Sequence, residues 1–295
     1  MRGFMRDAAF SGGMLGFMVL LLWKNAAVGQ AVREGLALCA RSVIPALFPF
    51  FAAVSFAVSC GFFARLRRLR LPLDAAVFLL GIVGGYPVGG RTIGALRQSG
   101  QISRLDAERL LTFCNNCGPS FILSIAGAGV FGSRRIGLAL YAIHTLAALA
   151  AGGLLGAFRH TSRERDALPA AGGTPSLPAV FVAGVRGAAL AMLNVCAFVV
   201  FFLVLAALLR QVWAGLPPAA LGLLELTCGI TALPDTAPAF CAAAGLLGWG
   251  GVSVHCQTAA VLEGTGIGMG RYLLAKAIQG GFSVLLALLS CRFFF

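Results

Sequence analysis

Glycine, proline and arginine crowd into one apolar stretch, residues 78–94, which otherwise has the composition of a membrane helix. Glycine lets the backbone leave the helical conformation, and proline removes an amide donor and disfavours helix at the residue before it. A helix interrupted inside a bilayer exposes helix ends and free amides, which transporters use to bind small solutes. The pattern therefore predicts a substrate-binding site. Its predicted residues are Gly85, Tyr86, Pro87, Val88, Gly89, Gly90 and Arg91.

Arg91 would place a fixed positive charge beside these amides, which favours an anionic solute that carries carboxylates. Two other interpretations compete with this one. Glycines also allow two helices to pack closely, and a long arginine side chain can reach from a span to the membrane interface. The clustered helix breakers around Pro87 fit a binding site better than a packing contact, whereas both interpretations of Arg91 stay open.

A second polar interruption, Cys-Asn-Asn-Cys-Gly-Pro, lies in the apolar segment 112–131. Each apolar arm is too short to span a bilayer, so the segment predicts a re-entrant hairpin. Asparagine offers donors and acceptors to a ligand, although turn chemistry in a water-exposed loop would use the same residues. The predicted binding residues of this tip are Asn115, Asn116, Gly118 and Ser120. Cys114 and Cys117 lack a second pair or nearby histidines, so no metal site is predicted.

The second half of the chain also carries polar positions in apolar surroundings. Glu225 lies in the apolar run 219–234, and an intramembrane carboxylate predicts a functional site. It could instead hold helices together through His255, Gln257 or Arg186, and a glutamate–histidine pair could relay a proton in coupled transport. The predicted binding residues of this half are Glu225, Thr227, Gly250, Gly251, Ser253, His255 and Gln257.

The composition is that of a membrane protein. The chain of 295 residues is 59% hydrophobic and only 11% charged, with a mean hydropathy of +0.91, far from the composition of soluble domains. The formal charge of +13 comes from arginines in short loops and at span ends, where they set topology and contact anionic lipid rather than nucleic acid. Nine cysteines, an odd number, predict buried thiols rather than a disulfide framework.

Seven apolar runs predict membrane spans, at residues 9–23, 43–63, 74–96, 136–158, 180–209, 219–234 and 272–290. Two further segments, 112–131 and 246–262, predict re-entrant hairpins. Residues 102–111 predict a short amphipathic helix that Ser103 caps.

The charged segment 159–178 predicts a linker, and the motifs before it recur in order after it. The predicted fold is an all-α polytopic membrane protein with an N-terminal helix, 1–30, and two gate-like repeats, 31–158 and 179–295. Each repeat has three spans and one re-entrant hairpin. Because the number of crossings is odd, the second repeat is inverted relative to the first, as in many transporters.

Several of these motifs together resemble one known family. Residues 85–91, 102–111 and 113–122 resemble motifs of the sporulation integral membrane protein family called YlbJ or SpoVV, and residues 225–229 and 249–257 resemble its later motifs. The resemblance covers residues 35–289, with Cys117 at a position where we expect a small residue such as serine. It implies a nucleoside recognition or gate domain and a remote similarity to concentrative nucleoside transporters. It also implies a role in endospore formation, moving dipicolinic acid from the mother cell across the outer forespore membrane.

We therefore expect a membrane transporter of a small anionic solute, for which the resemblance implies dipicolinic acid. Two alternatives stay open: a nucleoside-type transporter, and a non-transporting sporulation membrane scaffold. No hydrolase, kinase or nucleotide-binding motif occurs, so we expect no enzyme, cofactor or metal ion. The expected location is the cell membrane or the outer forespore membrane. The bilayer and the solute are the expected partners, nucleic acid is not, and formation of a homo-oligomer stays open.

Overall fold

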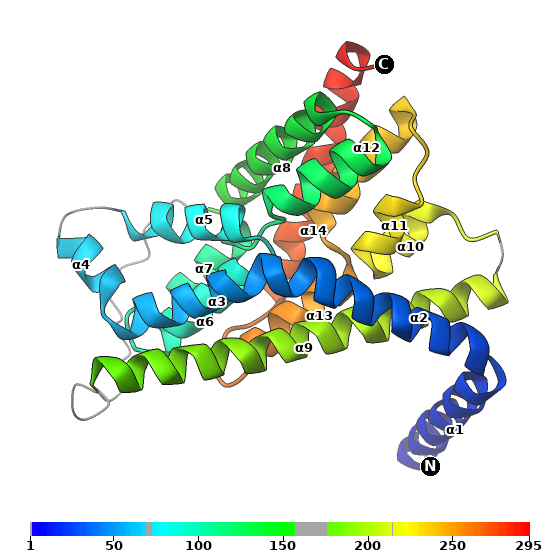
Figure 1. Cartoon of the computed structure of the whole chain (residues 1–295), viewed down its shortest axis with the longest axis horizontal. Coiled ribbons are helices and arrows are strands. Elements are labelled where there is room, and N and C mark those ends of the chain that lie inside the picture. The colour runs from blue at the N-terminus through cyan, green and yellow to red at the C-terminus, as the bar shows by residue number, and fades with distance from the viewer. Residues whose placement is uncertain (1, 69–71, 157–175, 214) are drawn as a thin grey trace.

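The structure is a computed structural model and describes residues 2–68, 72–156, 176–213 and 215–295. Residues 159–175 of the predicted linker lie outside the described residues. Within the described ranges the regular structure is helical and no strand occurs (Figure 1). The elements are α1 (Arg2–Trp23), α2 (Asn25–Leu38), η1 (Cys39–Val43), α3 (Ile44–Ser59), α4 (Phe62–Arg68), α5 (Leu73–Gly84), α6 (Val88–Gln98), α7 (Arg104–Cys114), η2 (Ser120–Val130), α8 (Arg134–Leu154), α9 (Leu177–Val212), α10 (Pro218–Leu224), α11 (Leu226–Thr231), α12 (Ala237–Trp249), α13 (Gly251–Val261), α14 (Gly270–Ser290) and η3 (Cys291–Phe293).

Five helical segments of the described chain are long and apolar enough to cross a membrane, judged by length and composition. They are Met5–Trp23, Arg134–Leu154, Leu177–Val212, Ala237–Val261 and Gly270–Phe293. A sixth crossing results if Asn25–Val43 and Leu47–Ser59, which are bent by 56°, count as one span. The all-helical, multi-pass prediction is confirmed. The predicted spans 74–96 and 219–234 take another form.

Two groups of helices lie on opposite sides of the molecule (Figure 1). The longest helix, α9, runs antiparallel to α2 and α3 and packs against both (Figure 1). On the opposite side, α8, α12 and α14 pack against one another. One buried hydrophobic cluster is built mainly on α3, α5, α6, α7 and α9, and a second mainly on η2, α8 and α11 to α14.

The predicted broken span 74–96 is instead a helical hairpin. Its arms, α5 and α6, are joined by residues 85–87 and pack against each other. Gly81 of α5 and Gly89 of α6 both lie so close to the carbonyl oxygen of Cys114 that a Cβ atom on either glycine would overlap it. Because glycine has no Cβ atom, the two arms can fold back around the end of α7.

The predicted broken span 219–234 also folds into a hairpin. Its arms, α10 and α11, are separated only by Glu225 and lie side by side (Figure 1). Gly229 of α11 lies directly on the backbone of Gly222 of α10, so that a Cβ atom at Gly229 would overlap it. In both hairpins, glycine at the point of contact lets the backbone segments approach closely, because glycine has no side chain.

The two predicted hairpins, 112–131 and 246–262, do not fold back. α12 and α13 together form the candidate span Ala237–Val261, interrupted at Gly250, which has a left-handed φ of 92°. α7 packs against α5, α6, α8 and α14, and η2 packs against α8 and α11. The two arms do not pack closely against each other, so they diverge from residues 115–119. The predicted interruptions are therefore in the right places, but which of them fold back was predicted wrongly, because that depends on what each arm packs against.

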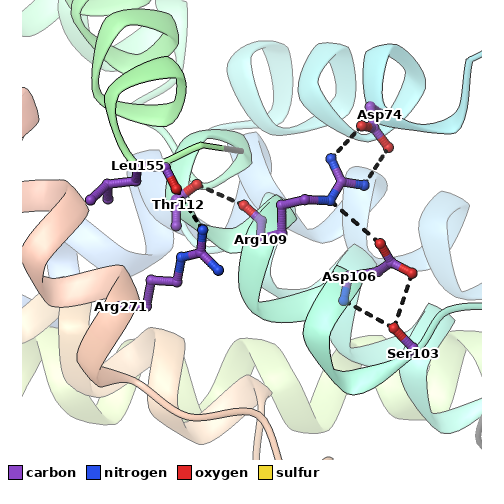
Figure 2. A network of polar contacts seen from close by, with 7 residues as sticks. All are labelled: Asp74, Ser103, Asp106, Arg109, Thr112, Leu155 and Arg271. Carbon is purple, nitrogen blue, oxygen red and sulfur yellow. Dashed lines mark hydrogen bonds and ion pairs between the residues drawn. The ribbon is translucent and has the colours of Figure 1, made fainter. Parts of the chain in front are cut away.

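An ion-pair network fastens the first hairpin to α7 (Figure 2). Arg109 of α7 donates to both carboxylate oxygens of Asp74, in the first turn of α5, at 2.6 and 3.1 Å. Arg109 also contacts Asp106 at 3.4 Å. Ser103 accepts a hydrogen bond from the Asp106 amide at 3.1 Å, which confirms the predicted N-cap. Bidentate geometry and burial make the Asp74–Arg109 pair a firm connection between the two elements.

Candidate functional site

A cavity of about 350 Å³ lies between the two hairpins, η2 and the interrupted crossing α12–α13. Its walls come from α2, η1, α3, α5, η2, α9, α11 and α13, so both halves of the chain contribute. Seven of the predicted binding residues line it: Gly85, Tyr86, Gly118, Ser120, Glu225, Thr227 and Gln257. Apolar side chains such as Phe50, Phe121 and Val199 make up most of the remaining wall. The fold thus brings together predicted positions that are far apart in the sequence.

Glu225 is the one charged side chain among the described residues of the cavity wall. It is 3% exposed, and its Oε2 accepts a hydrogen bond from the Cys228 amide at 2.7 Å, which caps α11. The carboxylate thereby lies at a helix N-terminus, where negative charge is favoured. Nδ1 of His255 lies 3.2 Å from the hydroxyl of Tyr272. No hydrogen bond joins Glu225 to His255 in the described part of the chain, where Nε2 of His255 is left without a partner. The predicted glutamate–histidine pair is therefore not observed.

A group of buried polar side chains adjoins the cavity at Tyr86. We call it the Lys276 cluster, and it comprises Tyr86, Asn116, His144, Lys276 and Gln279. Nζ of Lys276 donates to Oε1 of Gln279 at 2.7 Å, to Oδ1 of Asn116 at 3.3 Å and to the Tyr86 hydroxyl at 3.4 Å. Gln279 donates to Oδ1 of Asn116 at 3.3 Å and to the backbone carbonyl of His144 at 3.3 Å. The cluster therefore connects the first hairpin, the interruption after α7, α8 and α14.

Sequence reasoning missed Lys276 and Gln279. Lys276 is fully buried, and within the described part of the chain its hydrogen-bond partners are neutral groups rather than carboxylates. The signal was present in the sequence, because a lysine inside the apolar run 272–290 is an intramembrane ionisable residue, the same rule that selected Glu225. Gln279 follows three residues later and so lies on the same face of the helix.

Asn115 connects the two halves of the chain. Its Oδ1 accepts a hydrogen bond from the Gly90 amide at 3.1 Å. Its Nδ2 donates to the hydroxyls of Thr258 at 2.9 Å and Tyr272 at 3.3 Å. The Gly90 amide was predicted to face a solute, but it donates its hydrogen bond to the Asn115 side chain instead. This fully buried side chain holds α6, α13 and α14 together and does not line the cavity.

Arg91 lies away from the cavity. Its Nη2 donates to the hydroxyl of Ser55 at 2.8 Å, and its guanidinium lies 5.1 Å from the ring centroid of Phe51, so both contacts are with α3. The other predicted binding residues that do not line the cavity are Pro87, Val88, Gly89, Gly90, Asn115, Asn116, Gly250, Gly251, Ser253 and His255. The charge that was expected to attract an anion is thus not in contact with the space that could hold one.

The chain is similar to the sporulation integral membrane protein YlbJ of Bacillus subtilis (strain 168). The two are 26% identical over 88% of this chain and 76% of YlbJ. No family model matches the chain, and no solved structure matches it. The similarity supports the relationship to YlbJ that the motifs indicated. Together with the apolar spans, it shows that this is a multi-pass integral membrane protein.

Proposed function

We propose that this multi-pass membrane protein, a relative of a sporulation membrane protein, transports a small anionic solute during endospore formation, and that the solute is dipicolinic acid. The observation that carries the proposal is the cavity of about 350 Å³ between the two hairpins. Its volume is near the lower end of the range for small-molecule sites, ~300–1,000 Å³. Interrupted helices at the wall of an intramembrane cavity are the arrangement that secondary transporters use for solute binding.

The lining of the cavity suits a flat aromatic dicarboxylate. Phe50, Phe121 and Val199 offer apolar surface to a ring, and the side chains of Ser120 and Gln257 offer hydrogen-bond donors to carboxylate oxygens. The resemblance to the YlbJ or SpoVV family implies dipicolinic acid, which is such a molecule. The sporulation role named for YlbJ itself agrees with this proposal.

The order of elements supports an inverted repeat. The first half contains a long bent helix (α2–α3), a hairpin (α5–α6), the two shorter helices α7 and η2, which residues 115–119 separate, and a crossing (α8). The second half contains a long helix (α9), a hairpin (α10–α11), an interrupted crossing (α12–α13) and a crossing (α14). Three crossings per half would invert the second half, and α9 indeed runs antiparallel to α2–α3 (Figure 1). We propose these two units as the gate-like repeats of a transporter.

A nucleoside is the second candidate solute, and Glu225 favours it. A carboxylate in the cavity wall repels an anion but accepts hydrogen bonds from the hydroxyl groups of a ribose. The remote similarity to concentrative nucleoside transporters, which the family resemblance implies, agrees with this second candidate. The two solutes can be separated by direct binding.

The test is thermal unfolding of the purified protein in detergent over a concentration series of dipicolinate, succinate or uridine. A ligand that binds only the folded state stabilises it by about 2.7 kcal/mol at a hundredfold excess over its Kd. We expect saturable stabilisation by dipicolinate. In a second experiment, we expect liposomes that contain the protein to take up dipicolinate. Stabilisation by uridine alone would favour the nucleoside transporter. A well-folded protein that none of the three stabilises would refute the transport proposal and favour the membrane scaffold.

A further inference from the structure

Among the described residues, no carboxylate pairs with the ammonium group of Lys276. Its ammonium group is fully buried and bound by the amide oxygens of Gln279 and Asn116 and the hydroxyl of Tyr86. It also lies 5.2 Å from the ring centroid of Tyr86 and 5.9 Å from that of Tyr272. Dipoles and aromatic faces favour a cation without neutralising it. Because a buried charge without an opposite charge is costly, an anion that came near would be strongly favoured.

Tyr86 is the contact between Lys276 and the cavity. Tyr86 is one of the residues that line the cavity, whereas Lys276 is not. The Tyr86 hydroxyl accepts from Lys276 at 3.4 Å and donates to the backbone carbonyl of Leu247 at 3.4 Å. Both bonds are long, so the hydroxyl proton can turn towards another acceptor at little cost.

We infer that Lys276, acting through the Tyr86 hydroxyl, is the positioning pair that makes the cavity select an anion. The inference deepens the proposed transport function and rests on it. A carboxylate in the cavity accepts the Tyr86 hydroxyl proton in place of the Leu247 carbonyl, while the Tyr86 oxygen continues to accept from Lys276. The positive charge thereby polarises the hydroxyl towards the solute. Lys276 takes the role that the sequence suggested for Arg91, which contacts α3 instead.

This arrangement also explains how an anion can be held beside Glu225. The carboxylate of Glu225 is directed at the Cys228 amide, and Tyr86 belongs to the opposite hairpin. A dicarboxylate or its neutral diamide would have the same shape and make similar apolar contacts in the cavity. Only the charged molecule would benefit from Lys276, so the ratio of the two affinities measures the effect of its charge.

The test compares pyridine-2,6-dicarboxylate with the neutral pyridine-2,6-dicarboxamide, using thermal-shift titrations. The variants are Lys276→Met, which keeps the bulk of the side chain, and Tyr86→Phe, which removes only the hydroxyl. Lys24→Met is the matched control, because Lys24 is the other of the two lysines in the chain and lies over the Trp23 ring, away from the cavity. We expect the preference for the dicarboxylate to fall roughly 10- to 100-fold in both test variants, the range for hydrogen bonds to charged groups, and to stay unchanged in the control.

The failures of the two proposals are distinguishable. If the wild-type protein binds neither molecule, the proposed transport function fails, and the inference about Lys276 fails with it. If the wild type prefers the dicarboxylate and Lys276→Met and Tyr86→Phe retain that preference, the anion site stands but Lys276 does not select its charge. If Lys276→Met does not fold, Tyr86→Phe decides the question by the same ratio, because its ring still fills the same space.

Discussion

At the scale of single residues, Glu225 combines two tasks that oppose each other. It caps α11 through the Cys228 amide, and it lines the cavity that we assign to an anion. The capping bond holds the carboxylate at the end of the helix dipole, which reduces its repulsion of a solute without removing it. The two tasks can be separated, because capping needs an acceptor oxygen whereas the repulsion needs the charge.

Glu225→Gln keeps an acceptor for the Cys228 amide and removes the charge. We expect dipicolinate to bind about fivefold more tightly, which corresponds to roughly 1 kcal/mol of relieved repulsion, with a loss of stability below about 1 kcal/mol. Thermal-shift titration measures both quantities. Glu263→Gln is the control, because Glu263 is exposed and follows α13. Weaker dipicolinate binding in Glu225→Gln would show that Glu225 binds the solute directly.

At the scale of elements, the fold depends on two hairpins that close over glycine. Gly81 and Gly89 leave room for the carbonyl oxygen of Cys114, and Gly222 and Gly229 bring α10 and α11 together. The Asp74–Arg109 pair adds a charged connection between the first hairpin and α7 (Figure 2). The hairpins in turn carry Tyr86 and Glu225 to the cavity, so a change in their closure would alter the site.

Gly81→Ala would place a methyl group against the Cys114 carbonyl, which is backbone and cannot rotate away. We expect a loss of about 1–3 kcal/mol of stability, the usual cost of overpacking, and weaker solute binding. The matched control is Gly281→Ala in α14, where an added Cβ meets nothing within 4 Å. That control should be neutral or gain up to about 1 kcal/mol of helix propensity. Equal melting temperatures for both variants would contradict the hairpin closure described here.

At the scale of the whole molecule, the paths of α10–α11 and α12–α13 determine which loops share a side of the membrane. A hairpin returns its ends to the side from which it started, whereas a crossing delivers them to opposite sides. Gly215 and Asp235 flank the α10–α11 hairpin, and Gly264 follows the α12–α13 crossing. All three positions are exposed, which makes them accessible to a reagent on their own side.

Single substitutions Gly215→Cys, Asp235→Cys and Gly264→Cys test this topology with a membrane-impermeant maleimide on sealed vesicles. We expect Gly215→Cys and Asp235→Cys to react from one side and Gly264→Cys from the other. The wild-type protein gives the background, and its nine cysteines are buried or partly buried. Reaction of Asp235→Cys and Gly264→Cys from the same side would restore the hairpin that the sequence predicted at residues 246–262.

The sequence by itself determined the class of the protein and the positions of its interruptions. Long apolar runs indicate membrane helices. The Gly-Pro and polar motifs near Gly85, Asn116, Glu225 and Gly250 interrupt helices by local backbone chemistry. Seven of the predicted binding residues line the cavity, although it is the fold that brings these distant positions together. The Ser103 cap is likewise local and was predicted correctly.

Only the tertiary structure decided which interruptions fold back and which charge adjoins the cavity. Folding back at residues 85–87 depends on Gly81 and Gly89 meeting the carbonyl of Cys114, a contact between separate elements that no local pattern contains. Arg91 and Lys276 both lie in apolar sequence, yet Arg91 contacts α3 and Lys276 contacts Tyr86 at the cavity wall. The sequence gives the face of the helix on which a side chain lies, but not which element packs against that face. The partner of the side chain is therefore decided by tertiary packing.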